Sequence, residues 1–139
     1  PRSMMEEGNC EFSFSGLKTS VRYLLPKVDL SSSATLADVC ASFQEAVVEV
    51  LVEKTIRAAK ACRAQVVAVS GGVSCNTRVR DLFSQRCTRE GFELRLAQPQ
   101  YSTDNAAMIG FAAVQRWKAG FTSPLETDVD PNLSLVTAA

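Results

Sequence analysis

The longest run of regularly spaced apolar positions covers residues 36–63 and predicts a helix. Apolar side chains recur there at intervals of three and four, so one face should lie in the core. Thr35 and Asp38 are the expected N-terminal cap. The charged face should be solvated, or else serve as a docking surface. The apolar set is Leu36, Val39, Cys40, Phe43, Val47, Val50 and Leu51, and the charged set is Glu45, Glu49, Glu53, Lys54 and Arg57.

Shorter patterns precede that helix. Residues 11–15 alternate between polar and apolar and predict a short strand that ends at Gly16. Residues 17–25 predict a short helix, which Pro26 terminates.

A strand–helix–strand–helix order follows it. The β-branched run Val66–Val69 is typical of a strand covered on both faces in a parallel sheet. Residues 76–89 predict a helix that ends at Gly91, and residues 92–96 alternate as a second strand. Ser102 should cap a third long helix, residues 103–118, before Gly120. The expected fold is therefore α/β, helix-rich with a few mainly parallel strands. Residues 122–139 should form an irregular tail after a single lobe segment, residues 1–121.

Composition narrows the function classes. The 139 residues are 46% apolar and 22% charged, so the chain should fold as one domain or part of a larger one. Fifteen basic and fifteen acidic residues balance, which gives no overall attraction to nucleic acid or membrane. No apolar run is long enough for a membrane span, and we expect a cytoplasmic protein. Five cysteines without a Cys-x-x-Cys pair predict reduced thiols. The chain has no histidine, which excludes histidine-dependent catalysis and histidine-ligated zinc within it.

Two segments could carry chemistry, because each follows a predicted strand where parallel sheets bind ligands. In Ser70–Asn76, Gly71 and Gly72 would let the backbone approach a nucleotide, and Asn76 offers a donor and an acceptor. The alternative is a tight turn with Asn76 as a helix cap. In Ser102–Gly110, Asp104 is a candidate metal ligand or a carboxylate that stabilises the helix start. One carboxylate is too few for a metal site, so other ligands would come from elsewhere.

Four arginines decorate the helix after the glycines. They could contact RNA phosphates, although a solvated helix face is the simpler interpretation. They are Arg78, Arg80, Arg86 and Arg89.

Three motifs occur in order, and together they resemble the TsaD family of tRNA N6-adenosine threonylcarbamoyltransferases. They are FSFSGLKT (residues 12–19), SGGVxxN (70–76) and STDNAAMI (102–109). The resemblance covers residues 1 to about 121. It implies the C-terminal part of a lobe of the actin/Hsp70/sugar-kinase fold.

The resemblance also implies roles for particular residues. Asn76 would contact the adenylate of threonylcarbamoyl-AMP, with Gly71 and Gly72 as the adjacent wall. Asp104 would give one ligand to an active-site divalent metal, iron or zinc, which polarises the transferred group while the adenosine next to the anticodon attacks. The implied partners are tRNA, an inactive TsaB-like paralogue and a TsaE-like ATPase.

The chain departs from the family pattern in lacking the histidine metal motif and the phosphate loop of the first lobe. We therefore expect a C-terminal segment that needs an N-terminal lobe, is inactive alone and self-associates through uncovered apolar surface. A non-catalytic nucleotide-binding or scaffold half-protein is the alternative, and a kinase or ATPase lobe is a weaker one.

Overall fold

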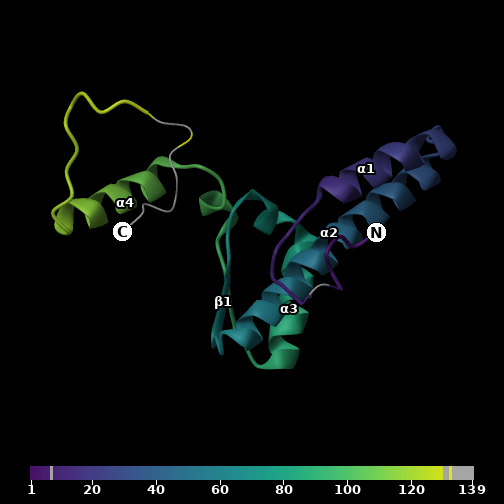
Figure 1. Ribbon diagram of the computed structural model, residues 1–139, viewed down its shortest axis with the longest axis horizontal. Coiled ribbons are helices and arrows are strands. Elements are labelled where there is room, and N and C mark those ends of the chain that lie inside the picture. The colour runs from purple at the N-terminus through teal and green to yellow at the C-terminus, as the bar shows by residue number, and fades with distance from the viewer. Residues whose placement is uncertain (7, 130–131, 133–139) are drawn as a thin grey trace. The chain divides into compact units, whose positions relative to one another are not determined.

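A computed structural model describes residues 1–6, 8–129 and 132 (Figure 1). The chain forms two compact units, residues 1–103 and 104–139, and each is described by itself. Among the described residues, no helix is both long and apolar enough to cross a bilayer. The predicted tail, residues 122–139, lies partly outside the described residues.

Among residues 1–6 and 8–103 of the first unit, the structure has three α-helices and two strands. Its elements are α1 (Ser15–Leu24), a 3-10 turn (Leu25–Lys27), α2 (Ser33–Ala61), β1 (Val66–Val69), a 3-10 turn (Gly72–Cys75), α3 (Thr77–Glu90), β2 (Glu93–Leu96) and a 3-10 turn (Pro99–Tyr101). The second unit holds α4 (Ala106–Lys118). The helix-rich α/β character predicted from the sequence is confirmed.

Strands β1 and β2 pair in parallel, with Val66 opposite Glu93 and Val69 opposite Leu96. Helix α3 connects them, and α2 and α3 pack together on one face of the sheet (Figure 1). The main core lies between these elements and consists of Val48, Val52, Ile56, Ala59, Val67, Val79, Phe83 and Cys87.

The expectation that β1 is covered on both faces was wrong for this chain. Val67 is buried against the helices, whereas Val66 and Ala68 on the other face are exposed. Among the described residues of the first unit only two strands occur, and α2 and α3 pack on the face that holds Val67, so nothing in this unit covers the second face. Helix α4 likewise buries none of its side chains within its unit, and its exposed apolar side chains include Ile109, Phe111 and Trp117. Uncovered apolar surface is thus present, while self-association stays a prediction.

The predicted strand at residues 11–15 was wrong: residues 10–14 have no regular structure and α1 begins at Ser15. A strand needs a neighbouring strand to satisfy its backbone groups. Here the carbonyl of Glu11 accepts instead from Lys54 Nζ of α2, at 2.7 Å. The same ammonium donates to the side-chain oxygen of Asn9 at 3.1 Å and lies 3.4 Å from its carbonyl.

Helix α2 is therefore buried along two stripes rather than one. Val48, Val52 and Ile56 face the sheet and α3. Ala46, Val50 and Lys54, spaced four residues apart, are also buried, and Lys54 meets the N-terminal segment. Two expectations fail in consequence. Lys54 is fully buried rather than solvated, and the predicted core positions Leu36, Cys40 and Phe43 are exposed, because the first third of α2 extends beyond the main core.

The N-terminal caps of α2 and α4 differ from those predicted from the sequence. The Ser32 hydroxyl caps α2, accepting from the Thr35 N–H, so Thr35 and Asp38 are not the cap. Asn105 caps α4 through the Met108 N–H, because Ser102 is buried and its hydroxyl donates to the Gln98 carbonyl. Helix α3 ends as expected at Gly91, whose φ of 78° lies in the left-handed region that favours glycine.

Candidate nucleotide-binding site

The loop after β1 is a tight turn that requires glycine at one position. Gly71 has a φ of 89°, which side-chain-bearing residues rarely adopt. A Cβ there would meet no atom within 4 Å, so conformation rather than crowding demands the glycine. The turn continues as the Ser74 N–H donates to the Gly71 carbonyl at 2.9 Å. At Gly71 and Gly72 the backbone therefore passes the end of the strand without side chains.

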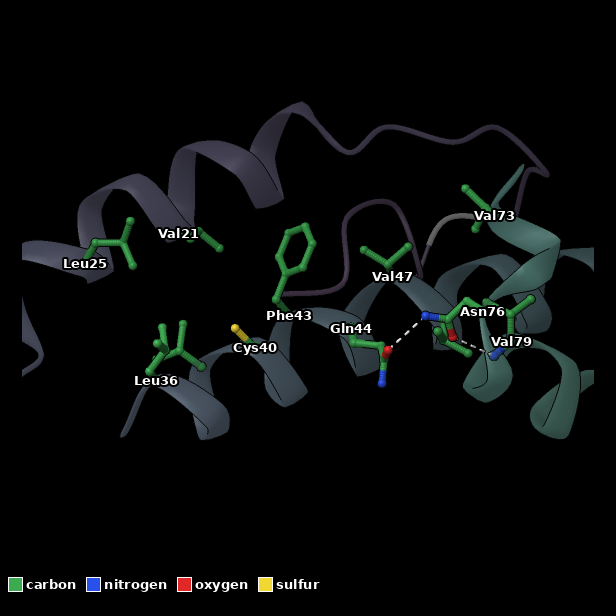
Figure 2. A pocket seen from close by; sticks show the side chains of 12 residues that line it. Val21, Leu25, Leu36, Cys40, Phe43, Gln44, Val47, Val73, Asn76 and Val79 are labelled. Carbon is green, nitrogen blue, oxygen red and sulfur yellow. Dashed lines mark hydrogen bonds between the residues drawn. The ribbon is translucent and has the colours of Figure 1, made fainter. Parts of the chain in front are cut away.

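Asn76 closes this loop and starts α3. Its side-chain oxygen accepts from the Val79 N–H at 3.1 Å, so the interpretation as a helix cap is correct. Its amide nitrogen donates to Gln44 Oε1 of α2 at 2.9 Å (Figure 2). Capping uses only the side-chain oxygen. The amide nitrogen has two N–H groups, and Gln44 accepts from one of them, so the other can bind a ligand. The structural and the functional interpretation of Asn76 are therefore compatible.

A cavity of about 550 Å³ lies beside Asn76, within the range of small-molecule sites. Figure 2 shows Val21 and Leu25 on the side of α1, facing Leu36 and Phe43 of α2 across the space. Gln44 and Asn76 supply the amides at its other end; the apolar lining is completed by Val39, Cys40, Val47, Val48, Val73 and Val79.

The loop after β2 is fixed against the loop after β1. The buried hydroxyls of Ser74 and Ser102 lie 3.2 Å apart in a hydrogen bond. Arg80 donates to the carbonyl of Ser74 at 3.0 Å and to that of Ala97 at 3.3 Å. These hydrogen bonds join the two loops that follow β1 and β2, at the edge of the sheet where the carboxyl ends of parallel strands meet.

Asp104 is exposed and opens the second unit, one residue before the Asn105 cap. It therefore lies outside the first turn of α4, contrary to the predicted helix start at residue 103. The structure groups Gly71, Gly72 and Asn76 in the first unit, and Asp104 is described in the second.

The arginines of α3 are mostly engaged by protein groups. Arg78 makes two hydrogen bonds to the carboxylate of Glu45, at 2.6 and 2.8 Å, and Arg86 pairs with Glu53. The hydrogen bond from Arg78 holds the pKa of Glu45 below its ordinary value. Arg80 binds the two carbonyls, so Arg89, at 71% exposure, keeps the most accessible guanidinium of the four. These ion pairs join α2 to α3, and part of the supposedly solvated charge is thus structural.

Comparison with known proteins adds the family. Residues 1–111 match the family model for TsaD, tRNA N6-adenosine threonylcarbamoyltransferase. The chain belongs to this family. It is 44% identical over 135 residues to the tRNA N6-adenosine threonylcarbamoyltransferase of Thermotoga neapolitana, covering 97% of the chain and 40% of that protein. It is 46% identical over 136 residues to that of Syntrophobacter fumaroxidans, covering 92% and 40%. The chain thus spans about 40% of the length of the curated relatives it matches.

The resemblance to TsaD inferred from three motifs is therefore confirmed. The structural roles of two residues of this candidate site, Gln44 and Arg80, were not predicted from the sequence. Gln44 interrupts an apolar stretch directly after Phe43, and that polar insertion was the available signal. Arg80 was grouped with its helix neighbours, and nothing in the pattern distinguished its role at the two carbonyls.

Proposed function

We propose that this chain forms one side of the nucleotide site of a tRNA threonylcarbamoyladenosine transferase. In the proposed reaction the N6 amine of the adenosine next to the anticodon attacks the carbonyl of threonylcarbamoyl-AMP. A C–N bond forms, the bond between the carbonyl carbon and the phosphate oxygen breaks, AMP leaves with that electron pair, and the amine nitrogen loses one proton to solvent. Because the chain spans about 40% of its relatives, we expect it to be inactive alone.

The observation that carries the proposal is the Gly71–Asn76 loop in a chain of the TsaD family. Its glycine conformation lets a ligand approach the backbone, and α3 begins there with partial positive charge that suits a phosphate. In this proposal Asn76 contacts the adenylate, and Gly71 and Gly72 form the adjacent wall. The parallel strands and covering helices support an actin/Hsp70/sugar-kinase-like lobe.

The donors on this chain do not by themselves fit an iron or zinc ion. Among the residues that the structure describes, no three side chains of His, Cys, Asp or Glu gather. Such ions take several nitrogen, sulfur or oxygen ligands. We therefore propose Asp104 as a single metal ligand whose companions come from residues outside this chain.

The proposed partners rest on family membership. They are tRNA as the acceptor, an inactive TsaB-like paralogue and a TsaE-like ATPase. The proposed location is the cytoplasm, because the proposed substrate is tRNA.

The test is Asn76→Ser in the full-length protein. Serine also caps helices, so α3 is preserved while the amide is lost. A hydrogen bond to a charged group contributes about 1.5–3 kcal/mol, so kcat/KM for threonylcarbamoyl transfer to tRNA should fall roughly ten- to a hundredfold. Gln85→Met, at an exposed position on α3, is the control. Wild-type activity of Asn76→Ser would refute the role of Asn76.

A further inference from the structure

The amide of Asn76 has its orientation dictated by a backbone group. The Val79 N–H can only donate, so the atom that faces it at 3.1 Å must be the Asn76 oxygen. The Asn76 nitrogen consequently faces α2, where Gln44 lies at 2.9 Å. Gln44 must then present its own oxygen to that nitrogen, and its NH2 group points away from Asn76 (Figure 2).

This arrangement leaves one N–H of Asn76 for a ligand. Asn76 Nδ2 has two N–H groups, of which Gln44 takes one. The other belongs to a side chain that is tied at both its oxygen and its nitrogen. Both residues line the cavity of about 550 Å³, so the remaining N–H lies beside a ligand-sized space.

Gln44 is not part of the hydrophobic core, so its side chain can orient the Asn76 amide without a packing role. Its side chain is exposed, whereas Ala46 and Val48 on the same helix are buried. Removing the Asn76 contact would leave the cap bond to Val79 as the single tether of a half-exposed amide. The side chain would then sample other rotamers, and ordering it on binding would cost free energy.

We propose that Gln44 is a positioning residue of the nucleotide site, which fixes the Asn76 amide so that its second N–H faces an acceptor atom of the bound adenylate. This inference rests on the proposed function, because it takes Asn76 as a nucleotide contact. Gln44 acts through Asn76 and has no independent share in binding.

The test is a double-mutant cycle with AMP as the probe, measured by isothermal titration calorimetry on the full-length protein. Gln44→Met keeps the length and apolar stem of the side chain but removes the acceptor. AMP affinity should fall about three- to tenfold, the worth of one ordered hydrogen bond. Gln44→Ala, a good helix former, should behave alike, and Gln85→Met on the exposed face of α3 should bind as wild type.

The cycle separates this inference from the proposed function. Adding Gln44→Met to Asn76→Ser should weaken AMP binding no further, because the amide to be positioned is already gone. Losses that multiply in the double variant would overturn the positioning role, as would wild-type affinity in both Gln44 variants. If Asn76→Ser alone binds AMP normally, the proposed function fails at its nucleotide contact and Gln44 falls with it.

Discussion

The buried ammonium of Lys54 offers the sharpest test of how this fold is held together. Its side chain is 0% exposed and donates to the Glu11 carbonyl at 2.7 Å and to Asn9 Oδ1 at 3.1 Å. Each charge-assisted bond contributes about 1.5–3 kcal/mol, but desolvating the ammonium costs several kcal/mol. Both acceptor residues are exposed and can return to water in a variant. Lys54→Met should therefore cost about 1–3 kcal/mol net of unfolding free energy.

The stem of the same side chain adds a separate term. Lys54→Ala removes three buried methylenes as well, at about 0.8 kcal/mol each plus the cavity, so it should cost roughly 2–4 kcal/mol more than Lys54→Met. Urea unfolding followed by circular dichroism measures both. Lys60→Met is the matched control on α2, because its side chain is 54% exposed and Glu90 keeps Arg86 and Arg89 as partners, so the midpoint should move little. Equal midpoints for Lys54→Met and wild type would refute the claim that the ammonium pins the N-terminal segment.

Three further predictions follow from the charges and thiols. Because the pKa of Glu45 is lowered by its hydrogen bond from Arg78, the stability it contributes is present above the ordinary value of 4.5 and is lost as the pH falls through the lowered pKa. Glu45→Gln should flatten this part of the acid profile of the urea midpoint, and a profile identical to wild type would contradict it. Burial raises the pKa of the Cys87 thiol, so under native conditions iodoacetamide should leave it unmodified. Mass spectrometry of the peptides should instead find label on the exposed thiols Cys10, Cys40, Cys62 and Cys75. Asp104→Ala in the full-length protein should lower the metal bound per polypeptide, measured by plasma mass spectrometry, whereas Asp128→Ala should not; unchanged metal content would remove Asp104 from the ligand set.

Local signals account for what the sequence predicted well. The β-branched run of β1, the alternation of β2 and the glycine at 91 each specify backbone geometry through their own side chains or lack of one. The loop Gly71–Asn76 was found for the same reason, since glycines after an apolar run are visible without knowledge of the fold.

What the sequence could not predict depends on residues far away in the chain. The burial of Lys54 requires oxygens 43 to 45 positions earlier, and no helical period contains that information. Ser102 fitted the pattern of a cap, but a partner at Ser74 and the Gln98 carbonyl drew its hydroxyl inward. Gln44 gains its place in the candidate site only because α3 begins beside α2.

The hydrogen bond between the Ser74 and Ser102 hydroxyls affects the order in which these two positions can be substituted during evolution. Ser74 donates to Ser102, and Ser102 donates onward to the Gln98 carbonyl at 3.1 Å. If alanine replaces Ser74, Ser102 keeps its own acceptor and no buried donor is orphaned. If alanine replaces Ser102 first, the buried Ser74 hydroxyl loses its acceptor at once. Substitution is thus easy in one order and costly in the other, so lineages should vary at position 74 while position 102 is retained.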